Sequence, residues 1–346
     1  MKKTISLALL LAATLPAAAQ TASVRPLALS AAEDYARQAR YPQWSTVLEL
    51  GAVDPLIADR QPSRQSALGA GGAGPRLTVW ASTISALPGE TVTLYAALAN
   101  LQTAPRSLLD GLVGSSSTVS GARISGELVG ERLGALGAVS YRDDGIAPDT
   151  IAGDGLYVAR YTLPVDRTPA LGTADSVMVK TQALLANNER RAVAGGFQFS
   201  NPAARLTGRY LDSVKNGNLV LAAEVEVLAP GRVYLTGTLA DLADLPLATA
   251  QAAQVLQPGK QWMDLSFYGL AFHDRGVAGK LRLASVALSS TNGMPNALGP
   301  VIGNAHVTQA YALTQFTKAS FADPALLETV KRLQLDAAGA LPALLK

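Results

Sequence analysis

The chain has 346 residues and contains no cysteine. This absence excludes disulfide bonds, thiolate metal sites and a thiol nucleophile. It also excludes a lipid anchor on a signal-peptide cysteine. Stability must therefore come from burial of apolar side chains, and hydrophobic residues make up 49% of the sequence, which is ample for that purpose.

The N-terminus has the pattern of a secretory signal peptide. Lys2 and Lys3 form a short positive segment, an apolar run from Ile5 to Leu15 follows, and Ala17-Ala18-Ala19 supplies the small residues of a cleavage site. The apolar run is shorter than the roughly 20 residues that span a bilayer. We therefore predict a signal peptide over residues 1–20, no stable transmembrane segment, and an exported protein that is periplasmic, cell-surface or secreted.

Charged residues are scarce, at 16% of the chain. Removal of Lys2 and Lys3 with the signal lowers the formal net charge from +3 to +1. No cluster of lysine and arginine resembles one that follows a phosphate backbone, so the composition argues against nucleic-acid binding.

The mature chain is too long for one typical core, and we predict two domains flanked by shorter segments. A lead-in over residues 21–75 contains a helix from Ser30 to before Pro42 and ends in a glycine-rich linker. Residues 76–201 and 202–318 each contain short alternating runs between turn signals, which is typical of β-sandwiches. Residues 319–346 contain an amphipathic helix from Pro324 to about Asp336, and a tail.

The predicted fold class is therefore all-β, with two tandem immunoglobulin-like β-sandwiches, an N-terminal lead-in helix and a C-terminal amphipathic helix. Two dipeptides predict hairpin turns within the sandwiches. Asn187-Asn188 tolerates left-handed backbone angles, and Asn216-Gly217 is the strongest short hairpin signal.

Four aspartates make a candidate metal site in the first sandwich: Asp143, Asp144, Asp149 and Asp154, all within twelve residues of a glycine-rich loop. Calcium requires hard oxygen ligands on a loop that bends sharply, and this loop offers both. The spacing does not match an EF-hand. The alternative is that these aspartates accept hydrogen bonds from backbone N–H groups in turns while glycine supplies positive φ.

The same stretch resembles a known family. Tyr141-Arg142-Asp143-Asp144-Gly145, then Asp149 and Ala152-Gly153-Asp154-Gly155-Leu156-Tyr157, are similar to an element of the bacterial choice-of-anchor X proteins. Similar segments of that family match Tyr41–Trp44 before Asp54-Pro55, and also Trp262–Gly269 and Arg275–Gly279. The resemblance implies an exported β-sandwich protein, with no known catalytic activity and no known ligand.

Catalytic motifs are weak. His273-Asp274 could form part of a hydrolase site, but no Gly-x-Ser-x-Gly elbow and no zinc-ligand spacing occur. Paired carboxylates could serve a glycosidase, whose sites usually carry several aromatics, and aromatics are 5% of this chain. Trp44, Trp80 and Trp262 are the candidate sugar platforms. A tryptophan in a sandwich strand is more often buried.

We therefore expect a non-catalytic structural, adhesive or accessory binding protein of the bacterial cell envelope, whose partner is an envelope protein or glycan. One alternative is a carbohydrate-binding module for envelope or extracellular glycans, which predicts an exposed tryptophan. A second alternative is a secreted hydrolase. The sequence leaves the oligomeric state open.

Overall fold

The computed structural model describes residues 17–57, 63–66, 74–99 and 121–338. These residues fall into two compact units. One unit combines the N-terminal residues up to Thr46 with those from Lys318 onward, and the other runs from Val47 to Thr317. The first sixteen residues of the predicted signal, the core of the predicted glycine-rich linker and the C-terminal tail lie outside the described residues.

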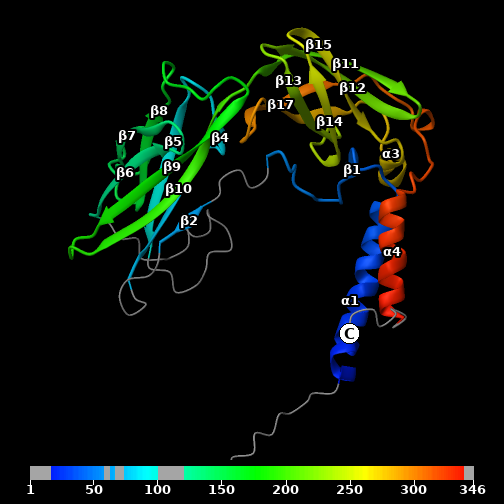
Figure 1. Ribbon diagram of the computed structural model, residues 1–346, viewed down its shortest axis with the longest axis horizontal. Coiled ribbons are helices and arrows are strands. Elements are labelled where there is room, and N and C mark those ends of the chain that lie inside the picture. Colours follow the sequence, from blue (N-terminus) through cyan, green and yellow to red (C-terminus); the bar gives the residue numbers. More distant parts are fainter. Residues whose placement is uncertain (1–16, 58–62, 67–73, 100–120, 339–346) are drawn as a thin grey trace, which may run out of the picture. The chain divides into compact units, whose positions relative to one another are not determined.

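The first unit is built from two helices, α1 (Ala17–Gln38) and α4 (Pro324–Ala337), which lie side by side (Figure 1). From Leu27 onward, their buried side chains are small: Ala28, Ala32, Val330 and Ala337. Asp323 caps α4 by accepting hydrogen bonds from the backbone N–H groups of Ala325 and Leu326, at 2.9 and 3.1 Å.

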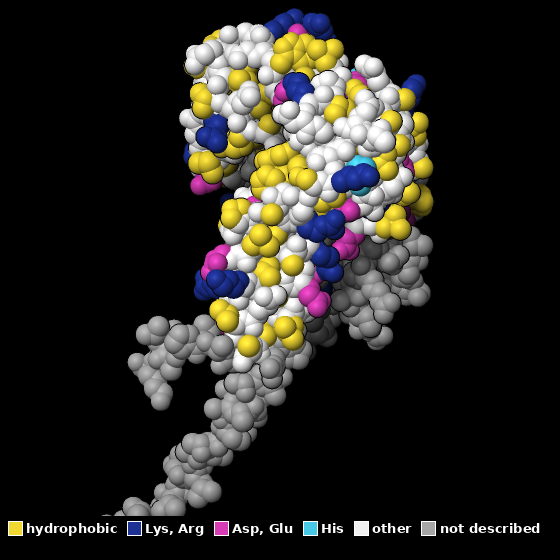
Figure 2. Space-filling view, turned by 90° about the vertical axis from the view of Figure 1, so that its right-hand side faces the viewer, with side chains coloured by type: hydrophobic (Ala, Val, Ile, Leu, Met, Phe, Trp, Pro, Cys, Tyr) yellow, Lys and Arg dark blue, Asp and Glu magenta, His cyan; other side chains and the backbone are white. Residues whose placement is uncertain are grey.

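Hydrophobic side chains remain on the surface of this helix pair (Figure 2). The exposed ones include Leu27, Leu29, Tyr35, Leu327 and Leu335. Of the apolar face predicted for the C-terminal helix, only Val330 is buried. Two helices that contact each other through small residues do not enclose a core, so the larger apolar side chains stay exposed.

The N-terminal helix begins earlier than predicted, at Ala17 rather than Ser30. Alanine is the strongest helix former, and residues 17–23 contain four of them. The end of the helix before Pro42 is confirmed.

Two facing sheets form the first β-sandwich in the second unit. One has the strand order β2-β3-β5-β8, and the other has the order β4-β10-β9-β6-β7. Their bounds are β2 (Arg64–Gln65), β3 (Arg76–Ala81), β4 (Ser85–Ala86), β5 (Thr91–Ala99), β6 (Arg123–Gly130), β7 (Gly134–Ser140), β8 (Leu156–Thr162), β9 (Thr173–Leu184) and β10 (Arg190–Asn201). Alternate residues of these strands meet in one core, which includes Leu94, Leu128 and Phe199.

A second β-sandwich follows. The sheet β11-β12-β15 faces a sheet that contains β14-β13-β16-β17. Their bounds are β11 (Ala204–Lys215), β12 (Asn218–Val227), β13 (Gly231–Ala240), β14 (Pro246–Leu256), β15 (Gly259–Phe267), β16 (Arg282–Thr291) and β17 (Ala297–Val307). Phe267, Leu219 and Leu235 are fully buried here.

Short segments complete the second sandwich. The helix α3 (Leu270–Arg275) ends at Gly276, which has φ +62°. Its Phe272 packs on Phe316, with ring centroids 4.2 Å apart, directly after the 3-10 helix η2 (Leu313–Gln315). Leu48, which follows β1 (Ser45–Val47), donates its N–H to Leu247 of β14 at 2.8 Å.

Both predicted hairpins are confirmed. Asn188 has φ +65° in the turn between β9 and β10. Asn216 and Gly217 have φ +52° and +73° between β11 and β12, as a type I′ turn requires.

The sequence analysis missed two long strands, β14 and β17, as well as the short strands β1, β2 and β4. Strand β14 is dominated by alanine and glutamine, and β17 contains Gly299, Pro300 and Gly303, which normally argue against a strand. Proline is tolerated in β17 because this strand lies at the edge of its sheet. The division into separate domains at residues 201 and 202 stays a prediction, because both sandwiches lie in one compact unit.

We predict that Phe267→Ala lowers the free energy of unfolding by about 3–5 kcal/mol, because it empties a fully buried site. Leu211→Ala removes a side chain that is 59% exposed and should change stability by less than about 0.5 kcal/mol. Urea denaturation measures both. Equal losses in the two variants would contradict the assigned core.

Candidate functional site

The acidic loop joins β7 to β8, and backbone N–H groups hold its carboxylates. Asp143 accepts hydrogen bonds from Gly153 at 2.7 Å and from Gly155 at 3.1 Å, through different oxygens. Asp154 accepts from Leu156 at 2.8 Å. These are the turn contacts of the alternative interpretation.

Asp149 lies at the centre of the loop and is buried. It accepts hydrogen bonds from the backbone N–H groups of Gly145 at 2.6 Å and of Ile151 at 3.3 Å. The bond from Gly145 is the main cause that lowers the pKa of the Asp149 carboxyl below its ordinary value. Gly145 has φ +70°, and a Cβ there would lie 3.0 Å from the backbone nitrogen of Ala152, so the fold-back requires glycine.

Three of the four predicted ligands come together. One carboxylate oxygen from each of Asp143, Asp149 and Asp154 lies within 4.8 Å of the other two. Asp144 is separate, because it accepts from the N–H of Ile146 at 3.0 Å and lies 3.8 Å from the guanidinium of Arg142. A calcium ion would require six to eight oxygens, and these residues offer three carboxylates already engaged in turns. The calcium interpretation stays a prediction.

The predicted tryptophan platforms differ in exposure. Trp80 on β3 is buried, with 8% of its surface exposed. It stacks on Tyr95, its cross-strand partner on β5, with ring centroids 5.3 Å apart. Trp44 in the lead-in is half-buried. Trp262 on β15 keeps 39% of its surface exposed, so it is the tryptophan that remains available to a ligand.

Trp262 belongs to the outer face of the sheet β11-β12-β15, which we call the Trp262 face. Alternation along the three strands places the following residues on it: Arg205, Arg209, Leu211, Lys215, Glu224, Glu226, Lys260, Trp262 and Asp264. Glu224 lies beside Trp262 in the register of β12 and β15.

A bulge in β11 shapes this face. The pairing of β11 with β12 shifts between Leu206 and Tyr210, and Gly208 inside the bulge has φ +84°. Arg209 is thereby aimed at Trp262, with its guanidinium carbon 5.8 Å from the ring centroid. The sequence carried one signal for this geometry, a glycine inside a strand pattern.

Glu224 fixes Arg209 over the ring. This glutamate is only 5% exposed. It accepts one hydrogen bond from the Arg209 guanidinium at 3.0 Å and another from the Thr207 hydroxyl at 2.8 Å. A buried carboxylate with two donors is satisfied, so the cluster is held in one geometry before any ligand arrives.

The other charges of the Trp262 face are largely paired as well. Arg205 contacts Glu226 at 2.6 Å, and Lys215 contacts Asp264 at 2.8 Å. The face therefore presents an aromatic ring among polar groups with little unbalanced charge. Such a surface suits a neutral, hydroxyl-rich ligand better than a strongly charged one.

A third cluster joins the two sheets of the second sandwich and was missed by the sequence analysis. Asp212 on β11 pairs with Nε2 of His306 on β17 at 2.7 Å, and accepts from the Tyr311 hydroxyl at 2.7 Å and the Gln309 N–H at 3.0 Å. Burial opposes ionisation of Asp212, but these donors hold its pKa below the ordinary value. Burial and Asp212 together raise the pKa of Tyr311 to about 12.

His273, which the sequence analysis considered for the hydrolase alternative, lies on α3. Its Nε2 is 3.1 Å from the carbonyl oxygen of Phe316, and this contact joins α3 to the segment after η2. This contact gives His273 a structural role, because it holds the two segments together.

The carboxyl groups of Asp149 and Asp212 also give no support to the hydrolase alternative. Their pKa values are lowered, whereas a general acid requires a raised pKa.

One family model matches part of the chain. A model described as the C-terminal domain of a domain of unknown function, DUF4785, matches residues 203–295. This part of the chain contains the Trp262 face. No curated protein matches the chain.

Three solved structures show similarity at low sequence identity. A DUF4785 family protein from Legionella pneumophila is 18% identical with a TM-score of 0.43, over 69% of this chain and 57% of that one. A Salmonella alpha-2-macroglobulin mutant is 15% identical with a TM-score of 0.29, over 70% and 15%. The Yersinia pseudotuberculosis adhesin InvE is 14% identical with a TM-score of 0.22, over 66% and 61%. This chain spans less than two thirds of each of these structures.

We predict that Asp149→Asn destabilises the protein by about 1–3 kcal/mol at neutral pH, because the buried charged acceptor of two backbone N–H groups is lost. Since the folded-state pKa is lowered, this stabilisation is present above the unfolded pKa of about 3.9 and is lost as the pH falls through the lower folded value. The gap between the two proteins should therefore close below about pH 4. A pH-independent gap in chemical denaturation would refute this account.

Asp212→Asn should also destabilise the fold by about 1–3 kcal/mol, because His306, Tyr311 and Gln309 lose a shared acceptor. The variant should in addition lower the pKa of one tyrosine from about 12, seen as tyrosinate absorbance that develops at lower pH. An unchanged alkaline titration would show that Asp212 does not control Tyr311.

Proposed function

We propose that this protein is exported and acts in the bacterial cell envelope by binding, as a structural, adhesive or accessory module, rather than by catalysis. The observation that carries the binding role is the exposed Trp262, held under Arg209 on the outer face of a rigid sheet. Tryptophan and arginine are enriched among residues that dominate binding energy.

Export is supported by the N-terminal sequence pattern around Lys2, Lys3 and Ala17–Ala19. The resemblance to choice-of-anchor X proteins supports an envelope location, and this narrower family assignment is part of the proposal. Among the described helices, none has the length and hydropathy to cross a membrane.

A glycan is the ligand class that the Trp262 face favours. The C–H face of a sugar ring can stack on an exposed indole, and its hydroxyls can bond to the polar groups around it. Because Arg209 and Arg205 are already paired with Glu224 and Glu226, a neutral sugar would not have to strip water from unpaired charges. The secreted hydrolase remains an alternative that no observation here favours.

We predict that Trp262→Ala reduces binding of the purified chain to native cell envelopes by at least about tenfold, because the central aromatic contact is removed. Co-sedimentation across a range of envelope concentrations measures the effect. Tyr234→Ala is the matched control. Tyr234 lies on β13, in the opposite sheet, and the guanidinium carbon of Arg232 is 5.5 Å from its ring centroid, so it forms a similar arginine–aromatic pair.

Saturable pelleting that depends on Trp262 and not on Tyr234 would support the proposal. Pelleting that both variants retain would remove the Trp262 face from the binding site. Repeating the experiment with calcium and with a chelator tests the acidic loop, because calcium-dependent pelleting would implicate Asp143, Asp149 and Asp154.

A further inference from the structure

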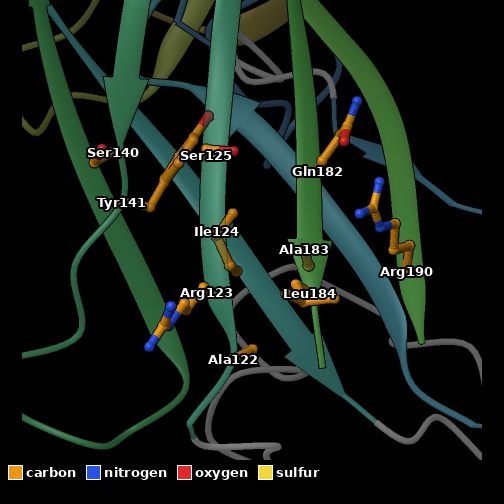
Figure 3. A pocket seen from close by; sticks show the side chains of 10 residues that line it. All are labelled: Ala122, Arg123, Ile124, Ser125, Ser140, Tyr141, Gln182, Ala183, Leu184 and Arg190. Carbon is orange, nitrogen blue, oxygen red and sulfur yellow. The ribbon is translucent and has the colours of Figure 1, made fainter. Parts of the chain in front are cut away.

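A second surface, in the first sandwich, has the opposite charge character to the Trp262 face. A hollow of about 530 Å³ lies over the ends of β6, β9 and β10 (Figure 3). Its lining includes Arg123, Ser125, Ser140, Gln182, Leu184 and Arg190. We call this the arginine hollow.

Strand register fixes the two arginines. Arg123 on β6 and Arg190 on β10 both pair with Leu184 on the strand between them, and Figure 3 shows them on either side of it. They are two strand spacings apart, or roughly 10 Å between Cα atoms. Both side chains are exposed, so they bracket the hollow rather than close it.

Neither guanidinium has a hydrogen-bond or ion-pair partner within the described part of the chain, in contrast to Arg205 and Arg209 on the Trp262 face. Two acidic side chains near these strands lie beside other basic residues. Glu189 contacts Arg191 at 2.8 Å, and Glu127 is the register partner of Lys180 on the neighbouring strand. The arginine hollow therefore carries positive charge without an internal counter-ion, and it can supply bidentate donors to an anion.

The polar groups beside the two arginines narrow the class of ligand further. The row beside the arginines contains the hydroxyls of Ser140 and Ser125 and the amide of Gln182, which are in register. These groups both donate and accept, as sugar hydroxyls do. The strands β6 and β9 are interior to their sheet, so their backbone groups are already paired and cannot take up a peptide strand.

We propose that the arginine hollow binds an anionic saccharide, with Arg123 and Arg190 contacting its carboxylate or phosphate groups and Ser125, Ser140 and Gln182 contacting its hydroxyls. The inference goes beyond the proposed function, because it uses a different surface and a differently charged ligand. It holds for the purified chain whether or not Trp262 binds an envelope component.

The test is a calorimetric titration of the purified full chain with oligogalacturonate at low ionic strength. A chelator is included, so that an ion held by Asp143, Asp149 and Asp154 of the acidic loop cannot contribute to the measured binding. Binding should weaken as salt is added. A neutral galactan oligomer of equal length should bind at least tenfold more weakly, and a sugar phosphate in place of the uronate distinguishes phosphate from carboxylate recognition.

Arg123→Gln and Arg190→Gln should each weaken oligogalacturonate binding about tenfold or more. Arg160→Gln is the matched control, because Arg160 is an exposed arginine on β8 of the other sheet, and its removal should change affinity less than twofold. All three positions are on the surface, and unchanged thermal midpoints would show that the fold is intact.

Three results would overturn the proposal: no binding of either anionic saccharide, equal losses in the Arg160→Gln control, or tighter binding of a polyglutamate peptide of the same charge. The arginine variants report on the arginine hollow, whereas Trp262→Ala reports on the Trp262 face. Calorimetry with the arginine variants can therefore fail while envelope co-sedimentation still depends on Trp262, and the reverse can also occur.

Discussion

Both sandwiches depend on the burial of one face of each strand against a facing sheet. No disulfide supports them, since the chain has no cysteine. Phe199 and Leu128 in the first sandwich, and Phe267 and Leu219 in the second, are almost completely buried, and each fully buried side chain of this size contributes about 1.5–3 kcal/mol. A slip of one residue in register would turn these side chains outward, so the alternating pattern holds both the core and the outer faces in place.

Edge strands impose the next constraint, because their free backbone groups invite unwanted pairing. On β7, the carbonyls of Leu136 and Ala135 accept hydrogen bonds from the Tyr161 hydroxyl at 2.6 Å and the Arg167 guanidinium at 3.0 Å. On β11, a bulge around Gly208 interrupts the ladder. The same bulge aims Arg209 at Trp262. One irregularity therefore both interrupts pairing at the edge and shapes the strongest candidate binding surface.

The two outer faces differ in how their charges are balanced. On the Trp262 face, Glu224 and Glu226 neutralise Arg209 and Arg205, which leaves the indole as the dominant contact. In the arginine hollow, Arg123 and Arg190 share a register row with Leu184 and no carboxylate. Exposed ion pairs add little to stability. Their arrangement matters more for which ligands each face can accept.

Much of the fold was predictable from local patterns, since alternation and turn residues act over a few positions. The sequence alone determined the all-β class, the hairpins at Asn188 and Asn216-Gly217, and an aspartate-rich turn between two strands. Tertiary structure decided that β14 and β17 are strands. Their own residues have low strand propensity, and pairing with β13 and β16 holds them extended. It also decided that Trp80 is buried on Tyr95 while Trp262 stays exposed, and that Asp212 meets His306. These outcomes depend on residues far apart in the chain, and only the packed sheets bring them together.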